Sequence, residues 1–380
     1  MGNKKTVLIT TTTPYMIKSF LMNDIRILKE LGYKVEVATN FKTFDVISED
    51  ELNKFKKLLD NESITINQIN FTRRIIDLKS IIKSYKEMKK LLNKKKYTLI
   101  HTHTPIAGLI TRISYKNSEI YKDSKMIYTA HGFHFFEGNS FIKNFIFKSI
   151  EKYGARFTDV LITINKEDYT AAKKFKLKQG GKVVYVPGVG IDTERIGLIT
   201  GKRDELIRKL HIPKESKLLL SVGELNDNKN HISVIKALPY LDKKYHYLIC
   251  GVGKLQQEII DTARNLGVED RLHLLGYRSD VISVMKSCDI FVFPSKREGL
   301  SVALMEAMAC DLPCLVSDIR GNNDLIENGK GGFVLPVNLF TESLIDKVDI
   351  KIKKGFNKNK SLYFDKKNIM EIMKKIYIDY

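Results

Sequence analysis

The sequence predicts an α/β protein built from two doubly wound domains that face each other across a cleft. Short apolar segments alternate with longer amphipathic ones along nearly the whole chain, a pattern typical of parallel sheets covered by helices on both faces. Gly or Pro follows nearly every apolar segment, as expected where strands end. The 380 residues, 43% of them hydrophobic, are enough for two ordinary cores.

The first domain is predicted over residues 1–187. Helical periodicity is clear where Ile82, Tyr85, Met88 and Leu92 recur at spacings of three and four. The expected strands are Val7–Thr11, Lys34–Thr39, Ser63–Phe71, Thr98–His101, Met126–Ala130, Val160–Ile164 and Val183–Val186. The expected helices are Met16–Leu31, Ile75–Leu92, Ile106–Tyr115, Phe141–Tyr153 and Lys166–Phe175.

The second domain is predicted over residues 188–364. Its basic beginning, up to about Pro213, is expected to be a linker. The expected strands are Leu218–Val222, Tyr247–Cys250, Leu272–Leu274, Ile290–Phe293 and Cys314–Ser317. A last helix over 365–380 is expected to return toward the first domain.

The formal net charge of +20 has several possible origins. Nucleic acid, an anionic membrane surface and acidic ligands all suit a basic protein, and a Lys-rich genome composition explains the charge equally well. The sequence shows no secretory leader and no run of about 18 apolar residues. Its four cysteines form no C-x-x-C pair, which favours buried reduced thiols in a cytoplasmic protein over a zinc site.

Two glutamates mark a candidate ligand site. Glu298 closes a loop after the strand Ile290–Phe293, and Glu306 follows eight positions later in the next predicted helix. Eight helical residues span about 12 Å, so both carboxylates can reach one elongated ligand that carries hydroxyls. Backbone amides of Gly299 and Leu300, at the expected helix start, suit a pyrophosphate. A solvated loop and an exposed helix face are the alternative, against which the apolar neighbours of Glu306 argue.

Other polar or glycine positions follow predicted strands. Lys229 comes six residues after Gly223 and is either a phosphate ligand or an ordinary solvated lysine. Gly251 and Gly253 either contact the ligand or only let a strand and a helix approach closely. His131 ends a strand at the predicted edge of the cleft. Three further histidines follow strands, but no carboxylate lies near them in sequence and the chain has no D-x-D motif, so we expect no metal site.

These motifs resemble family-4 retaining glycosyltransferases of the GT-B fold, whose two Rossmann-like domains face across a cleft. The resemblance covers essentially the whole chain. It is carried by E-x7-E after F-P-S-x-x-E-G, and by Gly223–Asn230, Gly251–Gly253, Gly276–Val281 and Gly321–Asp324. The segments 101–105 (HTHTP) and 130–136 (AHGFHFF) resemble members that build bacterial capsular polysaccharides and exopolysaccharides.

The resemblance implies roles in binding a nucleotide-sugar donor. Glu306 would bind the ribose, Glu298 the sugar hydroxyls, Gly299 and Leu300 the phosphates, and Lys229 the pyrophosphate. Gly223, Gly251 and Gly253 would lie at the same donor site.

One residue departs from the family pattern. Many members have Arg after the glycine that matches Gly223, whereas this chain has Glu224, which removes a cation from the phosphate site. Lys229 would then carry that role, helped by Arg278 or by a lysine nearby.

On the first domain, His131 matches a family histidine near the transferred sugar. We expect it to donate or accept a hydrogen bond with a sugar hydroxyl and not to abstract a proton. Thr13, Tyr15 and His103 are expected on the acceptor side.

The resemblance implies a hexosyltransferase or N-acetylhexosaminyltransferase that acts with retention and without a metal cofactor. The donor would be a UDP-sugar and the acceptor a growing glycan, linked to a polyprenyl diphosphate. Two alternatives remain: a sugar-nucleotide epimerase of the same fold, and a basic nucleic-acid-binding protein. The latter lacks a recognition-helix motif, so no nucleic-acid partner is expected.

Two segments suggest contact with a membrane. Residues 79–96 hold eight lysines and one acid, and residues 141–156 combine phenylalanines with lysines. Basic amphipathic helices of this kind bind anionic lipid headgroups, although ordinary sheet-packing helices with solvated outer faces have the same pattern. We expect a peripheral position on the inner face of the cell membrane.

Overall fold

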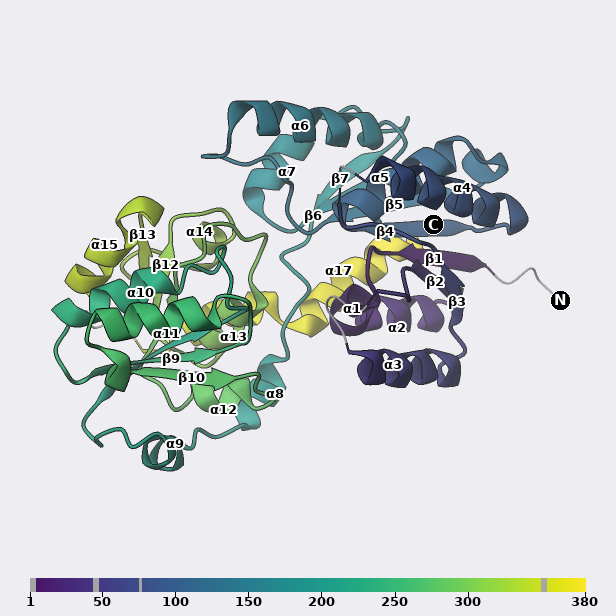
Figure 1. Ribbon diagram of the computed structural model, residues 1–380. Coiled ribbons are helices and arrows are strands. Elements are labelled where there is room, and N and C mark those ends of the chain that lie inside the picture. The colour runs from purple at the N-terminus through teal and green to yellow at the C-terminus, as the bar shows by residue number, and fades with distance from the viewer. Residues whose placement is uncertain (1–4, 44–47, 75–76, 350–353) are drawn as a thin grey trace. The chain divides into compact units, whose positions relative to one another are not determined.

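The computed structural model describes residues 5–43, 48–74, 77–349 and 354–380 (Figure 1). The chain divides into two compact units, which we call unit 1 (residues 1–189 with 369–380) and unit 2 (residues 190–368). The boundaries expected from the sequence, after residues 187 and 364, differ from these by two and four residues.

Unit 1 contains a parallel sheet with the strand order β3-β2-β1-β4-β5-β6-β7. Its central strands are buried, and Val7 of β1 lies between Val35 of β2 and Leu99 of β4. The strands are β1 (Thr6–Thr10), β2 (Lys34–Thr39), β3 (Thr65–Gln68), β4 (Leu99–His103), β5 (Lys125–Ala130), β6 (Val160–Thr163) and β7 (Lys182–Tyr185).

The helices of unit 1 follow the predicted alternation with two differences. The expected helix over 16–31 begins as α1 and passes through a π-helical turn at Ile17–Leu21 before α2. The sequence analysis missed α3, which begins after Ser48 caps the amide of Glu51 and which buries only three apolar side chains. The helices are α1 (Pro14–Met16), α2 (Met22–Glu30), α3 (Glu49–Asn61), α4 (Leu78–Lys94), α5 (Pro105–Lys116), α6 (Phe141–Ala155) and α7 (Lys166–Ala172). Residues 75–76, predicted to open the helix that becomes α4, lie outside the described residues.

Unit 2 contains a second parallel sheet with the order β10-β9-β8-β11-β12-β13. The strands are β8 (Lys217–Val222), β9 (Tyr245–Cys250), β10 (Leu272–Gly276), β11 (Ile290–Phe293), β12 (Cys314–Ser317) and β13 (Gly332–Leu335). The sequence analysis missed β13, a four-residue strand that pairs with β12.

The helices of unit 2 include two in a segment that we predicted to be a linker. That prediction was wrong: α8 and α9 occupy it, Asp192 caps the amide of Arg195, and Ile196, Leu206 and Ile207 are buried. The helices are α8 (Thr193–Leu198), α9 (Arg203–Lys209), α10 (Ile232–Ala237), α11 (Gln256–Asn265), α12 (Val281–Met285), α13 (Val302–Ala309), α14 (Asn322–Leu325), α15 (Phe340–Lys347) and α16 (Phe356–Ser361).

The last helix, α17 (Lys366–Ile378), belongs to the core of unit 1. Its side chains Ile369, Met373, Ile376 and Tyr377 pack into the same apolar cluster as residues of β1, β2 and α2. The end of the chain therefore completes the unit in which the chain begins.

Each sheet has one position where the strand order changes direction. It lies between β1 and β4 in unit 1, and between β8 and β11 in unit 2. Ligands of open α/β sheets bind beyond the carboxyl ends of strands at such positions. Among the helices in the described ranges, none is both long and apolar enough to cross a bilayer.

Candidate functional site

A lysine and a glutamate meet at the point in unit 2 where the strand order reverses. Lys229 follows β8, Glu298 follows β11, and their Nζ and Oε1 atoms are 2.7 Å apart. Both side chains are largely buried, and the ammonium lies 4.6 Å from the centre of the Phe293 ring. The structure therefore brings together two residues that the sequence analysis assigned to different parts of one ligand.

The glycines of this region let the loops approach closely. A Cβ atom at Gly251 would lie 1.8 Å from the carbonyl oxygen of Gly223, and one at Gly253 would lie 2.4 Å from that of Leu225. The Lys229 side chain passes over Gly223, where a Cβ would meet its Cε at 3.0 Å. Close approach, one of the two interpretations above, is what these glycines provide, and their contact with a donor stays a prediction.

The helix after Glu298 begins later than expected. We predicted its start at Gly299, but Ser301 is the cap, its hydroxyl accepts from the Leu304 amide, and α13 begins at Val302. Gly299 and Leu300 lie in the turn before this cap. Gly299 packs closely against Gly321, since a Cβ at Gly321 would lie 2.3 Å from the Gly299 carbonyl oxygen. The amides of Gly299 and Leu300 thus belong to a turn and not to the first turn of the helix.

Glu306 projects from α13 among apolar side chains, as the sequence predicted. Burial raises its pKa from 4.5 to about 7, and the charge of Arg195 opposes that rise. Within the described ranges no side chain or amide hydrogen-bonds to this carboxylate. A half-buried carboxylate without a protein partner is suited to accept hydroxyls of a ligand.

The other charged side chains considered for the phosphate site of unit 2 differ from expectation. Arg278, predicted to help Lys229, donates from two nitrogens to the carboxylate of Asp280 at 2.7 Å each. Glu224 is exposed. Arg320, which the sequence analysis missed, donates from Nε to the carbonyl oxygen of Glu298 at 3.2 Å. The sequence signal that could have identified Arg320 was its position directly before Gly321, the first residue of the predicted motif.

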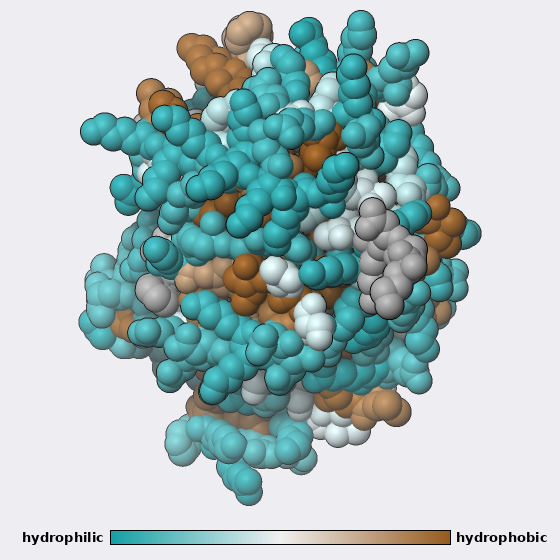
Figure 2. Space-filling view, turned by 90° about the vertical axis from the view of Figure 1, so that its right-hand side faces the viewer, coloured by the Kyte–Doolittle hydropathy of each residue, from teal (hydrophilic) through white to brown (hydrophobic). Residues whose placement is uncertain are grey.

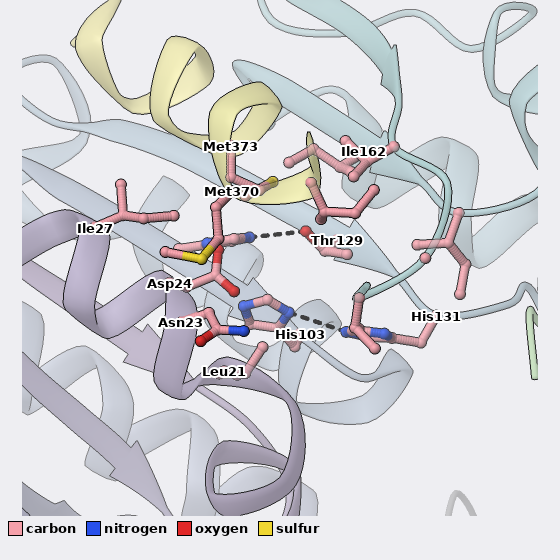
Figure 3. Close-up of a pocket in the computed structure, with 16 residues that line it drawn as sticks. Leu21, Asn23, Asp24, Ile27, His103, Thr129, His131, Ile162, Met370 and Met373 are labelled. Atoms are coloured by element: carbon pink, nitrogen blue, oxygen red, sulfur yellow. Dashed lines mark hydrogen bonds between the residues drawn. The ribbon is translucent and has the colours of Figure 1, made fainter. Parts of the chain in front are cut away.

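In unit 1, histidines at the carboxyl ends of β4 and β5 line a pocket of about 450 Å³ (Figure 3). His103 Nδ1 and His131 Nε2 are 3.1 Å apart, and His101 hydrogen-bonds to Thr129 and to Tyr377 of α17. Figure 3 shows Met370 and Met373 of α17 above the ring of His103. The predicted residues His103 and His131 are thus direct neighbours.

All three rings are neutral at neutral pH. Burial lowers the pKa of His131 to about 4 and that of His101 to about 3, and lowers that of His103 well below its usual value. The buried Nε2 of His103 has no partner among the described residues. Because an orphaned N–H costs more than an orphaned acceptor, His103 is expected to donate from Nδ1 to His131. His131 then keeps an N–H at Nδ1 that can donate to a ligand.

The other predicted acceptor-side residues lie after β1. Thr13 lines a polar pocket at the ends of β1, β2 and β3, and Tyr15 of α1 is 38% exposed with its ring edge-on to Phe20. The hydroxyls of Thr12 and Thr104 are 2.7 Å apart, and Thr104 has a φ of 64°, which is strained for a β-branched residue. The loops after β1 and β4 thus contact each other where the strand order changes.

No group of three or more potential metal-ligating side chains occurs in the described parts of the chain. The prediction that no metal takes part stays a prediction. The four cysteines are free thiols, and three of them are buried.

The chain is similar to known proteins along nearly its whole length. Residues 202–368 match the family model described as glycosyl transferases group 1, and residues 7–165 match glycosyl transferase 4-like. The chain is 30% identical to EpsD of Bacillus subtilis (strain 168), named as a glycosyltransferase, over 99% of this chain and 97% of that protein. It is 31% identical to UDP-Gal:alpha-D-GlcNAc-diphosphoundecaprenol alpha-1,3-galactosyltransferase of Escherichia coli, over 75% of this chain and 74% of that protein.

Solved structures share the fold. Anabaena Alr3699/HepE in complex with UDP and glucose superposes with a TM-score of 0.72 at 18% identity, over 99% of this chain and 100% of that one. Sucrose-phosphate synthase from Thermosynechococcus elongatus gives 0.74 at 16% identity, over 99% and 98%. The comparisons give no support to the epimerase alternative, and they confirm the predicted α/β architecture of two doubly wound domains. The chain belongs to the glycosyltransferases and has the GT-B fold.

Proposed function

We propose that this glycosyltransferase transfers a hexosyl or N-acetylhexosaminyl group from a UDP-sugar to a growing glycan on a polyprenyl diphosphate, with retention, in capsular or exopolysaccharide synthesis. The observation that carries the proposal is the Lys229–Glu298 pair at the strand-order change of unit 2. The E. coli relative is named for UDP-Gal and a diphosphoundecaprenol-linked sugar. CapM of Staphylococcus aureus, 27% identical over 81% of this chain and 80% of that protein, is named for capsular polysaccharide biosynthesis.

The donor would bind both to hydrogen-bond donors, which suit its diphosphate, and to carboxylates, which suit its hydroxyls. An ammonium has three donors, and Glu298 takes one of those on Lys229, so the others are available to the diphosphate. The amides of Gly299 and Leu300 add neutral donors. The carboxylates of Glu298 and Glu306 would accept hydroxyls of the sugar and the ribose.

The chemical step would exchange one bond for another at the anomeric carbon. The bond from this carbon to the diphosphate breaks, an acceptor hydroxyl oxygen bonds to the same face, and its proton passes to the departing phosphate oxygen. Lys229 would stabilise the charge that develops on the leaving diphosphate. His131, neutral at neutral pH, would donate from Nδ1 to a hydroxyl of the transferred sugar.

The test of this function is a transfer assay after a donor screen. Thermal shift with UDP-, GDP- and ADP-sugars selects the donor, and mass spectrometry then detects an extended polyprenyl-diphosphate glycan. Lys229→Met should lower kcat by about 100-fold or more, whereas Lys254→Met, at an exposed ion pair, should change it little. Absence of any extended lipid-linked product with every donor would overturn the proposal, and an inverted linkage by NMR would overturn retention.

Transfer is proposed to need no metal, since Lys229 and backbone amides supply the positive field at the phosphates. Activity should therefore survive a chelator. A loss restored only by added divalent cation would contradict this.

We propose that unit 1 also binds the surface of an anionic membrane. The helix α6 exposes Phe141, Ile142, Phe145 and Ile146 beside its lysines, and α4 exposes Ile82. Figure 2 shows hydrophobic side chains at the upper left edge of the view, next to hydrophilic ones. Phe145→Ser should weaken sedimentation with phosphatidylglycerol vesicles, and binding should fall as salt rises. Equal binding to neutral vesicles at any salt would contradict the electrostatic part.

A further inference from the structure

A mostly apolar groove lies between α4, α5 and α6 of unit 1, and we call it the apolar groove. Two polar side chains, His134 and Glu151, line it together with the apolar side chains Ile81, Pro105, Ile106, Leu109, Ile110, Phe147 and Ile150. The one carboxylate at the groove, Glu151, is already bound by Arg112 at 2.9 Å and by the Tyr128 hydroxyl at 3.0 Å. The groove is therefore suited to a hydrocarbon chain.

A polar hollow lies at the carboxyl ends of β1, β2 and β3, and we call it the basic pocket. Arg73, Arg74 and Lys83 line it with one acid, Asp77, whose carboxylate caps α4 by accepting from the Ser80 amide. In the described parts of the chain, no ion pair uses the three cationic heads. Hydroxyl and amide side chains after β1, β2 and β3 complete a lining that suits phosphate oxygens.

The two sites share their dividing wall. The first turns of α4 face the basic pocket with Ser80 and Lys83 and the apolar groove with Ile81. On the other side, Thr12 of the basic pocket hydrogen-bonds to Thr104, and the next residue, Pro105, lines the apolar groove. A ligand that is anionic at one end and a hydrocarbon at the other can thus occupy both by crossing the beginning of α4.

We propose that these sites together bind the lipid carrier of the acceptor, with the isoprenoid chain in the apolar groove and its diphosphate in the basic pocket. This inference rests on the proposed function and deepens it, since it assigns recognition of the carrier to unit 1. The charge of three cations against one acid complements a diphosphate, and the paired state of Glu151 leaves the groove without an uncompensated charge.

The direct test uses farnesyl diphosphate on the full chain. The sequence contains no tryptophan, so Phe147→Trp places a single reporter in the wall of the apolar groove. Its emission should shift to shorter wavelength with farnesyl diphosphate and not with inorganic diphosphate. The matched reporter Leu58→Trp, on an exposed site of α3, should not respond.

Calorimetry on the unmodified chain gives a second measurement that no variant can compromise. Farnesyl diphosphate should bind at least about tenfold more tightly than inorganic diphosphate or farnesol, because burying several methylene groups contributes more than this factor. Equal affinity for farnesyl and inorganic diphosphate would overturn the groove assignment. Equal affinity for farnesyl diphosphate and farnesol would overturn the basic pocket.

Two variants with controls locate each part. Arg73→Ala with Lys83→Ala should weaken farnesyl diphosphate about tenfold or more, whereas Lys54→Ala with Lys57→Ala on α3 removes the same charge and should not. Leu109→Asp should cancel the advantage of farnesyl over inorganic diphosphate.

The results also separate this inference from the proposed function. The enzyme could transfer sugar to lipid-linked acceptors at a rate that depends neither on the length of the isoprenoid chain nor on Leu109→Asp. That result would support the proposed function and overturn the carrier site. Farnesyl diphosphate binding without transfer from any donor would keep the site and overturn the function. Binding to phosphatidylglycerol vesicles with no response to farnesyl diphosphate would show a headgroup surface instead of a carrier site.

Discussion

At the scale of single residues, Glu306 shows how burial prepares a group for a ligand. Its pKa of about 7 means that a carboxylate with an ordinary value of 4.5 is only partly ionised at neutral pH. The folded state therefore binds a proton that the unfolded state has released between these two values. A ligand that hydrogen-bonds to the ionised form repays part of this cost.

Replacing Glu306 by Gln should change stability in a pH-dependent way. Because the folded pKa lies above the unfolded one, the contribution of Glu306 is intact below about pH 4.5 and is lost as the pH rises through 7. At pH 8, Glu306→Gln should therefore be more stable than the native chain by about 2 to 3 kcal/mol of unfolding free energy, and it should melt at a higher temperature. At pH 4.5 the two proteins should melt at nearly the same temperature. Thermal melts at both pH values measure this, with Glu342→Gln on an exposed site as the control. A pH-independent difference would show that the carboxylate is not the cause.

Donor binding should depend on the same proton. If Glu306 binds the donor as proposed, ligand hydroxyls favour its ionised form, so binding of a UDP-sugar should lower the pKa of Glu306 and release a proton. The Kd should fall as the pH rises through 7 in the native chain and stay level in Glu306→Gln. Calorimetry in two buffers of different ionisation enthalpy would detect the proton. Identical pH profiles for the two proteins would remove Glu306 from the donor site.

At the scale of elements, α5 and α6 are held together by a buried ion pair and by glycines. The guanidinium of Arg112 is fully buried, bonds to Glu151 and lies 3.9 Å from the centre of the Tyr128 ring. Gly154 of α6 leaves room for it, since a Cβ there would lie 2.6 Å from Arg112 Cζ. The helix α6, which exposes apolar side chains near its first residue, is thus held to α5 by contacts near its last residues.

Gly154→Ala should destabilise unit 1. The added methyl group has to displace the buried guanidinium, which costs about 1 to 3 kcal/mol and is not offset by the better helix propensity of alanine. Gly197→Ala in α8 is a matched control because a Cβ there meets nothing within 4 Å. Melting temperatures of the two variants decide the point, and equal values would show that α6 moves away at little cost.

At the scale of the whole molecule, unit 1 is closed by the last helix of the chain. Tyr377 donates to Asp24 at 2.6 Å and therefore accepts from Nδ1 of His101, whose Nε2 accepts from Thr129. Burial raises the pKa of Asp24 to about 6, against the effect of the Tyr377 hydrogen bond. This chain of hydrogen bonds ties α17 to α2 and to the central strands.

Tyr377→Phe should lower the unfolding free energy of unit 1 by about 1 to 3 kcal/mol, because it leaves Nδ1 of the buried His101 without a partner and removes one hydrogen bond from Asp24. Hydrogen exchange should speed up in residues 5–189 and 369–380 while unit 2 stays protected. Tyr363→Phe, whose ring is 57% exposed, serves as the control. Loss of protection spread evenly over both units would contradict the assignment of α17 to unit 1.

Much of the fold followed from the sequence because buried parallel strands are continuous apolar runs with clear ends. The ranges of β2, β11 and β12 were predicted to the residue, as was the position of Glu306 in an apolar helix. The missed elements α3, α8 and α9 are rich in charge and bury few side chains each. The Lys229–Glu298 pair joins residues 69 positions apart, and only the strand order, which no local pattern contains, brings them together.

The place of α17 has a consequence for how the protein is made. During synthesis, residues 1–189 of unit 1 leave the ribosome first. The apolar face that Ile369, Met373 and Ile376 cover stays exposed until α17 has been synthesised. Unit 2, encoded later, has its whole core by residue 368. Domains usually fold in the order of synthesis. Here the domain begun first is finished last, so a chain truncated within α17 has a complete unit 2 joined to a unit 1 whose apolar face is exposed.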